Sequence, residues 1–166
     1  NNLTNIWTEG DDDYPVIDKT LAVAPSKDAS GYYLIGSAFQ LDWFAKFVNA
    51  GNPSSSAKLI ADINLGNKRM ENIGSNAVKY AGTFDGQGFT IYNLYIAKTG
   101  NDKGLFGSTT AAAVIKNFTL KNAYVNTNGS YVGGVVGLLR GTVSNVNIEG
   151  LNINAASYVG GVIGQS

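Results

Sequence analysis

Apolar and polar residues alternate with a period of two along the second half of the chain, which is the period of β-strands and not of helices. The same alternating pattern occurs three times, at residues 89–96, 113–120 and 141–148. A short glycine-bounded segment, such as Gly134-Val-Val-Gly137, follows each copy. Repeats at such intervals predict a solenoid whose turns are made of short strands.

Each copy of the pattern changes phase by one residue at an asparagine, and we interpret these asparagines as corners, because a slip of one residue otherwise turns every later side chain to the other face. In a parallel β-helix, equivalent positions of successive turns stack about 4.8 Å apart. The asparagines that align the three copies are Asn93, Asn117 and Asn145. This alignment predicts three inward stacks: Ile91–Ile115–Val143, Leu94–Phe118–Val146 and Ile96–Leu120–Ile148.

The asparagines themselves are expected to form an inward ladder, because a side-chain amide offers donors and an acceptor to the turns above and below. Asn117, the middle rung, is expected to matter most for stability. The alternative is that asparagine is simply common in turns.

A helix is predicted upstream of the repeats. Ser37 is a suitable N-cap, and Gln40 completes a capping box three residues later. The apolar residues Leu41, Phe44, Ala45 and Val48 then follow the spacing of one buried helical face. We expect this helix to cover the N-terminal end of the β-helix, where exposed strand edges invite aggregation; the alternative is a contact surface for a partner.

The chain is therefore predicted to form one continuous all-β domain with two parts. Residues 1–51 form N-terminal strands and the capping helix, and residues 52–166 form the parallel β-helix repeats. The strands expected in the first part lie at 14–17, 21–23 and 32–35, and an irregular first coil is expected at 59–65 and 73–74.

Composition narrows the chemistry that the chain can perform. The 12 basic and 12 acidic residues cancel, so no electrostatic argument favours nucleic acid or an anionic membrane. Cysteine and histidine are absent, which excludes disulfides, Ser-His-Asp and Cys-His catalysis, and zinc sites that need these ligands. No cofactor and no membrane insertion are expected, and a secretory leader is not testable in a chain that begins at Asn1.

Two polar segments have both a functional and a structural interpretation. Asp85 lies in Gly82-Thr-Phe-Asp-Gly-Gln-Gly88, where its carboxylate is either a catalytic or calcium ligand or, as we favour, a turn residue that accepts from backbone amides. The acidic cluster at 9–13 offers oxygens that suit calcium, but its spacing is not that of an EF-hand, and we favour a solvated loop. The glycine pairs at 133–134 and 160–161 precede no helical pattern, so a phosphate-binding loop is not expected.

From residue 32 to residue 166 the chain resembles the GLUG-motif surface proteins of bacteria, which are typical of gut anaerobes such as Bacteroides. The resemblance rests on the segments 33–51, 59–65, 82–96 and 104–107. It implies a right-handed parallel β-helix exported to the cell surface, with a role in cell adhesion. It implies no peptidase, because the zinc motif needs histidines, and it supplies no defined ligand site.

Three function classes remain open. The first is a non-catalytic extracellular adhesion or recognition module at the bacterial cell surface, binding a glycan or a protein through outward-facing Tyr92, Tyr95, Lys116 and Tyr124. The second is a passive spacer within a larger surface protein. The third is a polysaccharide lyase or hydrolase, which we do not favour, because the acids after residue 82, namely Asp85, Asp102 and Glu149, form no paired column. The tyrosines also have a structural interpretation, as a cross-strand surface stack.

The repeats run to the last residues of the sequence without a capping helix or a polar final coil. This pattern is consistent with a fragment of a longer solenoid, or with end-to-end self-association through the uncapped last coil.

Overall fold

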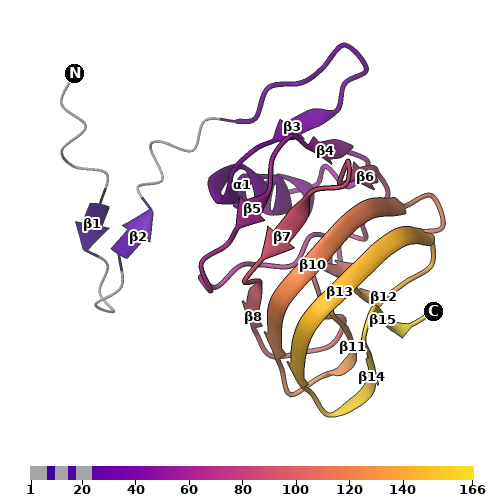
Figure 1. Ribbon diagram of the computed structural model, residues 1–166. Helices are drawn as coiled ribbons and strands as arrows, with labels where there is room; N and C mark the ends of the chain where they lie inside the picture. The colour runs from indigo at the N-terminus through magenta and orange to yellow at the C-terminus, as the bar shows by residue number, and fades with distance from the viewer. Residues whose placement is uncertain (1–6, 10–14, 18–23) are drawn as a thin grey trace.

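The computed structural model describes residues 7–9, 15–17 and 24–166, and it is a parallel β-helix of about five turns with one helix near its N-terminal end (Figure 1). One column of the stack runs β3–β4–β6–β10–β13, all in parallel. The fold class predicted from the sequence is therefore confirmed.

The elements of the stack have short strands in the first turns and long ones later. In chain order they are β3 (Tyr33–Ile35), α1 (Ala38–Asn49), β4 (Ala57–Leu59), β5 (Ile63–Asn64), β6 (Thr83–Asp85), β7 (Thr90–Tyr92), β8 (Tyr95–Ala97), β9 (Phe106–Ser108), β10 (Val114–Asn126), β11 (Ser130–Gly133), β12 (Val136–Leu138), β13 (Thr142–Asn154), β14 (Ser157–Gly160) and β15 (Ile163–Gln165).

The N-terminal segment contains two further strands, β1 (Trp7–Glu9) and β2 (Pro15–Ile17), which pair antiparallel. β2 corresponds to the strand predicted at 14–17, whereas the strand predicted at 21–23 and most of the acidic cluster lie outside the described residues. β3 corresponds to the strand predicted at 32–35. Because β3 pairs in parallel with β4, the stack begins before α1.

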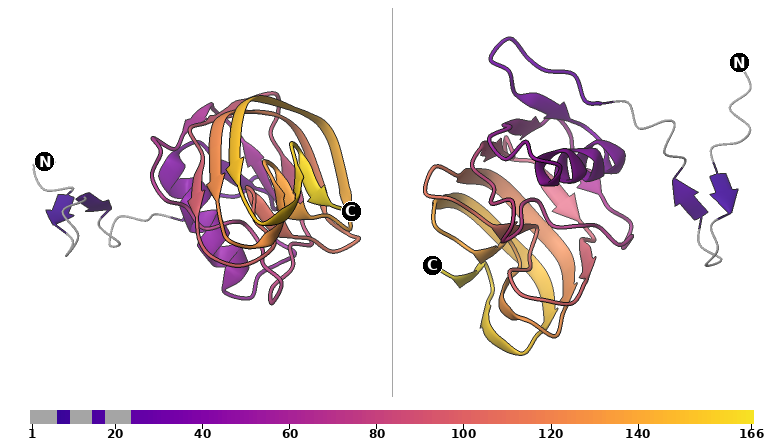
Figure 2. Two further views of the ribbon diagram at one scale, coloured as in Figure 1. Left: turned by 90° about the horizontal axis from the view of Figure 1, so that it is seen from below. Right: turned by 180° about the vertical axis from the view of Figure 1, so that it is seen from behind.

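Helix α1 begins where its capping residues predict. The Ser37 hydroxyl accepts from the Gln40 backbone N–H at 3.3 Å, while the Gln40 side chain accepts from the N–H of Gly36 at 2.7 Å, one residue before the cap. The four residues of the predicted apolar face are all buried. Phe44 contacts the rings of Tyr33 and Phe84, so the helix covers the first turns, at the end of the stack opposite β13–β15 (Figure 2).

The core is a set of inward columns, one side chain per turn. The longest column contains Tyr33, Ala57, Phe84, Ile115 and Val143. A connected group of aromatic rings extends from α1 into the middle turns, and it consists of Tyr33, Phe44, Tyr80, Phe84, Phe106 and Phe118. The inward residues of the last turn are aliphatic.

The predicted register is right for the last two turns and wrong for the turn before them. Ile115 lies opposite Val143 and Leu120 opposite Ile148, as expected. Ile91, however, lies opposite Leu120 instead of Ile115. The cause is that the two asparagines lie at different corners. Asn93 follows Tyr92, which lies opposite Lys121, so its equivalent in the next turn is Asn122, whereas Asn117 lies at the corner that follows Asp85 and Lys116. Aligning the copies on Asn93 therefore shifted that turn.

The predicted asparagine ladder is confirmed for Asn117 and Asn145, which lie at one corner, and it is wrong for Asn93. Asn145 donates to Asn117 at 2.9 Å, and Asn117 donates to Asp85 at 3.0 Å. Asn93 lies at another corner and donates to Asn64 at 2.9 Å. The ladders lie at the surface of the corners and do not point inward, because Asn93 and Asn117 are half-buried and Asn145 is exposed. All three predicted corner asparagines have positive φ, between 50° and 62°, a conformation that asparagine tolerates better than most residues.

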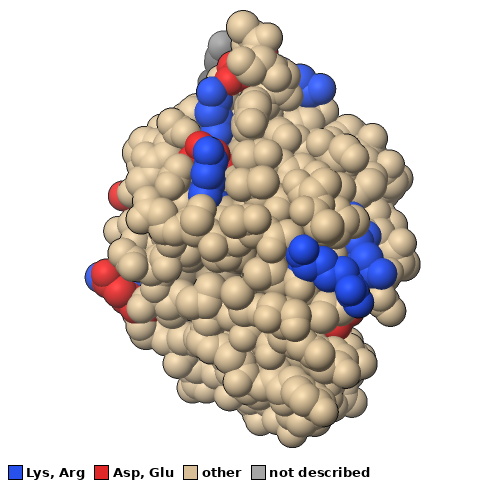
Figure 3. All heavy atoms as spheres, turned by 90° about the vertical axis from the view of Figure 1, so that its right-hand side faces the viewer, with Lys and Arg blue, Asp and Glu red and all other residues tan. Residues whose placement is uncertain are grey.

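The last turn is the least covered part of the described chain. Its inward residues, such as Val143, Ile148 and Ile163, are partly buried, whereas their partners in the turn before are fully buried. Figure 3 views the molecule from the side on which the C-terminus lies and shows few, small groups of charged residues on a mostly uncharged surface. End-to-end self-association through this turn stays a prediction.

The repeated closing glycines permit close contact between turns. A Cβ atom at Gly107, Gly137 or Gly164 would lie no more than 2.5 Å from an atom of another turn, which is too close for a real Cβ atom. Gly161 is different, since a Cβ there would meet nothing within 4 Å. At Gly107, Gly137 and Gly164, glycine is thus needed because the backbones of neighbouring turns come close together.

Asn117→Ala should lower the free energy of unfolding by about 1–3 kcal/mol, because it leaves the amide of Asn145 and the carboxylate of Asp85 without their partner. Asn122→Ala, at an exposed position of β10 that also has a positive φ of 53°, is the matched control and should have a smaller effect, because it changes the same backbone conformation without breaking the ladder. Urea unfolding followed by circular dichroism measures both, and equal midpoints for Asn117→Ala and wild type would remove the ladder from the account of stability.

Gly137→Ala should destabilise the protein by about 1–3 kcal/mol or more, because the new methyl group overlaps backbone atoms of Asp102 and Lys103. Gly161→Ala is the control, with open space at the new methyl group. Thermal melts of the two variants would contradict this explanation if they shifted by the same amount.

Candidate functional site

The four residues predicted to bind a ligand lie on different faces of the β-helix. Tyr95 and Tyr124 occupy equivalent positions of β8 and β10 and are brought together. Tyr92 lies on β7, on the strand before the Asn93 corner, next to Lys121. Lys116 lies on the first part of β10, where it pairs with Asp85 at 3.4 Å. The predicted set is therefore not one site.

Tyr95 and Tyr124 form a stacked pair with ring centroids 5.5 Å apart and planes inclined by 13°. Each ring covers one face of the other, so the faces between them are closed to a sugar ring. The register places Arg69 next to Tyr95 and Asn152 next to Tyr124 on the outer sides of the pair, so the ring edges and the hydroxyl groups are left for a ligand. The structural interpretation of these residues as a cross-strand stack is thus confirmed, and it changes how they can contact a ligand.

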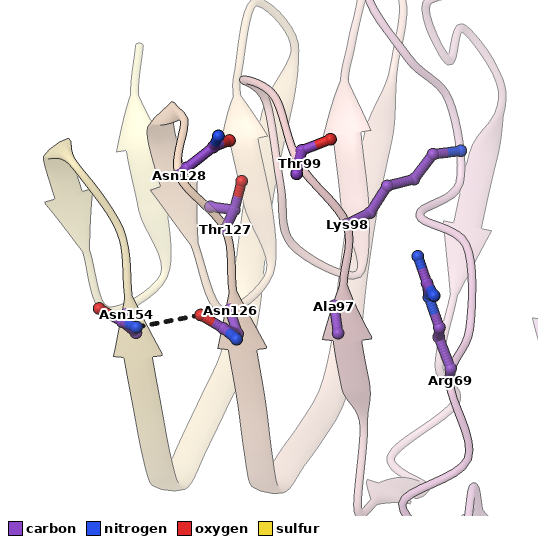
Figure 4. Close-up of a pocket in the computed structure, with 8 residues that line it drawn as sticks. All are labelled: Arg69, Ala97, Lys98, Thr99, Asn126, Thr127, Asn128 and Asn154. Atoms are coloured by element: carbon purple, nitrogen blue, oxygen red, sulfur yellow. Dashed lines mark hydrogen bonds between the residues drawn. The ribbon is translucent and has the colours of Figure 1, made fainter.

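An open groove of about 620 Å³ lies where the strands of this same face end (Figure 4). Its lining residues come from four successive turns and are Arg69, Ala97, Lys98, Thr99, Asn126, Thr127, Asn128 and Asn154. Because Ala97 and Asn126 each follow a tyrosine of the stacked pair by two residues, the groove and the pair share one outward face.

The floor of the groove contains a second amide ladder. Asn154 donates from Nδ2 to Oδ1 of Asn126 at 3.0 Å, and Figure 4 shows the Nδ2 of Asn126 on the side of Ala97. Ala97 occupies the equivalent position in the turn before. Among the described residues, Nδ2 of Asn126 has no hydrogen-bond acceptor.

Hydroxyl and amide groups also shape the rim. The Thr127 hydroxyl donates to the carbonyl of Gly100 at 2.7 Å, and the N–H of Gly100 donates to Oδ1 of Asn128 at 3.1 Å. These bonds tie the loop after β8 to the loop after β10. The rim is therefore held between turns and leaves further polar atoms facing the groove.

Two cations line the groove, and they differ in their partners. Lys98 forms an ion pair with Glu71 at 3.1 Å. The guanidinium of Arg69 makes no ion pair or hydrogen bond within the described part of the chain. Figure 4 shows Arg69 on the turn beside Ala97, while the Lys98 side chain extends away from the amide ladder. Among the described residues, the groove thus has one positive charge with an acidic partner and one without.

Sequence reasoning missed the groove because its residues are far apart in the chain and individually ordinary. A signal was present: Asn126 and Asn154 are separated by the same 28 residues as Asn117 and Asn145. In a parallel stack, an equal interval places both pairs in neighbouring turns, so the interval itself indicates a second ladder.

Asp85 is the first rung of the other ladder and also a turn residue. Its Oδ1 accepts from the backbone N–H of Gln87 at 3.0 Å, as the turn interpretation predicts. Partial burial acts to raise the pKa of Asp85, but hydrogen bonds from Gln87 and Asn117 and the charge of Lys116 hold it below its usual value. The carboxylate is therefore ionised and occupied.

The other acids considered for catalysis, Glu149 and Asp102, have different surroundings. Glu149 pairs with Lys121 at 2.9 Å. Asp102 is 5% exposed, and burial raises its pKa more than the nearby Lys103 and Lys79 lower it.

Within the described ranges, no group of three or more acidic residues is placed to hold a metal ion. In the same ranges, no helix has the length and apolar character needed to cross a membrane.

Comparison with known proteins gives two similar chains. Halomucin of Haloquadratum walsbyi is 35% identical over 145 residues, which cover 77% of this chain and 2% of halomucin. A Gly-rich membrane protein of Evansella cellulosilytica is 32% identical over 126 residues, which cover 70% of this chain and 14% of that protein. No protein-family model and no solved structure matches. The chain thus spans a small part of the relatives it matches.

Acid should destabilise the protein partly through Asp85. A pKa lowered on folding means that Asp85 stabilises the folded state above the usual aspartate pKa of about 4 and that this contribution is lost as the pH falls through the lower, folded-state value. Unfolding free energies measured from pH 6 to pH 2 should fall less steeply for Asp85→Asn than for wild type. Identical pH profiles would contradict this role; Asp28, whose pKa a hydrogen bond from Lys58 lowers, accounts for part of the remaining slope.

Proposed function

We propose that this chain is a recognition module of the cell surface that binds a glycan on the face formed by β8 and the last parts of β10 and β13. The observation that supports this most is the open polar groove beside the Tyr95–Tyr124 pair. Hydroxyl, amide and guanidinium groups gather there in fixed positions, and these are groups that bind sugar hydroxyls through hydrogen bonds. The proposed function is binding without catalysis.

The shape of the groove fits an extended ligand better than a small enclosed one. Its lining comes from successive turns of the stack, so polar groups recur at the spacing between turns, about 4.8 Å. A chain of sugars laid across the turns would meet several of them at once. The rigid stack positions these groups before binding, which reduces the entropy that binding costs.

An extracellular location is part of this proposal. One relative is named a mucin and the other a membrane protein, and both names agree with a protein at the cell surface. The absence of cysteine and the small number of charges place no obstacle to such a location. The GLUG-type resemblance supports the same expectation.

A passive spacer is the second candidate. The observation that favours it is the use of polar side chains between turns, as in the Asp85–Asn117–Asn145 ladder, which stiffens a solenoid without needing a ligand. A spacer and a recognition module share this scaffold. They differ in whether the groove face binds anything.

Binding of the purified chain to a broad glycan array separates the two candidates. We expect saturable binding to at least one glycan class, and we expect Tyr95→Ala/Tyr124→Ala to weaken it by about tenfold or more, because a hydrogen-bonding and packing contact is typically worth 1–2 kcal/mol.

Tyr92→Ala is the matched control, since Tyr92 belongs to another face. It should bind as wild type does. No binding to any glycan would favour the spacer, and equal losses in the double variant and the control would place the site elsewhere.

A further inference from the structure

We propose that the groove binds the carboxylate of an acidic glycan, at the position of the second amide ladder that Ala97 leaves empty. This inference rests on the proposed glycan-binding function and names the class of sugar. It follows from comparing the two ladders of the same molecule.

The first ladder shows what a complete column looks like. Every amide in it donates toward the earlier turn: Asn145 to Asn117, and Asn117 to Asp85. The column ends on the carboxylate of Asp85, which accepts a hydrogen bond from the last amide. Because an ionised carboxylate has no hydrogen to donate, the column needs no further acceptor beyond it. A cation, Lys116, lies beside that carboxylate at 3.4 Å.

The second ladder has the same direction but no terminal acceptor. Asn154 donates to Asn126, and the register then places Ala97 where the first ladder has its acceptor. A methyl group accepts no hydrogen bond, so the amide N–H groups of Asn126 face the groove. Figure 4 shows this gap between Asn126 and Arg69.

A cation lies beside this gap as well. Arg69 belongs to the turn before Ala97 and has no ion-pair partner among the described residues. Its planar guanidinium matches the two oxygens of a carboxylate. Asn126 and Arg69 together therefore offer a bound carboxylate the same kinds of partner that Asn117 and Lys116 offer Asp85.

One acid lies near the gap, and a lysine neutralises it. Arg69 lies opposite Tyr95, so Glu71, two residues later, is the residue of that turn at the level of Ala97. Lys98 pairs with Glu71 at 3.1 Å. The remaining lining is uncharged and consists of threonine and asparagine side chains around Ala97. A second anion bound at Arg69 would therefore meet a net positive groove.

A glycan fits this lining better than an acidic peptide does. The Thr99 hydroxyl and the side-chain N–H groups of Asn128 are hydrogen-bonding groups suited to ring hydroxyls on either side of a carboxylate, whereas the Thr127 hydroxyl is engaged with Gly100 and Gly129. The lining has no large apolar side chain to receive a peptide side chain. The tyrosine hydroxyls and ring edges extend the polar face along the strands.

The test uses oligogalacturonate and its carboxyl-reduced, neutral counterpart as probes, with isothermal titration calorimetry on the whole chain. We expect the acidic oligomer to bind at least about tenfold more tightly than the neutral one. Arg69→Gln should abolish this preference, whereas Arg140→Gln, the other arginine of the chain and exposed, should keep it.

Ala97→Asp is the sharper variant because it supplies the missing carboxylate from the protein itself. It should complete the ladder, leave the melting temperature unchanged or raise it, and reduce binding of the acidic oligomer to the level of the neutral one. An unchanged or raised melting temperature would show that the loss of binding is not a loss of structure. Ala97→Ser, a small substitution without charge, should retain the preference.

The outcomes separate this inference from the proposed function. If both oligomers bind equally and Arg69→Gln has no effect, the carboxylate site is wrong and glycan recognition stands. If neither these oligomers nor any array glycan binds, the proposed function fails with it. If poly-glutamate binds as tightly as oligogalacturonate and is lost in the same variants, the assignment to a glycan is overturned.

Discussion

In-register stacking of parallel turns is the constraint on which the rest of this structure depends. Each side chain meets the side chain of the same position in the turns before and after it, so like residues are brought into contact along the whole column. Aliphatic residues then bury one another, tyrosines stack, and amides bond to amides. A position whose residue changes from one turn to the next either ends a column or opens a site.

The two ends of the molecule satisfy this constraint differently. At the first end, α1 places Phe44 against rings of the first turns and closes the core. At the other end, β13 has a partner on one side only, and its apolar residues are partly exposed. Aromatic rings fill the space between the helix and the first turns, where Phe44 contacts Tyr33, Tyr80 and Phe84.

The groove lies where the regular pattern of the stack is interrupted. Asn126 and Asn154 continue the rule that amides stack on amides, and Ala97 breaks it in the preceding turn. Within the described part of the chain, the break leaves an amide of Asn126 without an acceptor, in the groove that Arg69 also lines. Function in a regular stack is therefore to be sought where the column pattern is interrupted, not where it repeats.

The class of fold, the capping helix and the corner asparagines follow from the amino-acid sequence, because strand alternation, capping chemistry and phase changes are local signals. The alignment of Ile91 was wrong, because each long turn has more than one corner and Asn93 lies at a different one from Asn117. Which turns align, that Tyr95 meets Tyr124 while Tyr92 does not, and that Arg69 shares a groove with Asn154 became evident from the three-dimensional structure. These contacts depend on how many residues each corner holds, and that number follows from backbone geometry in three dimensions and not from the residue pattern.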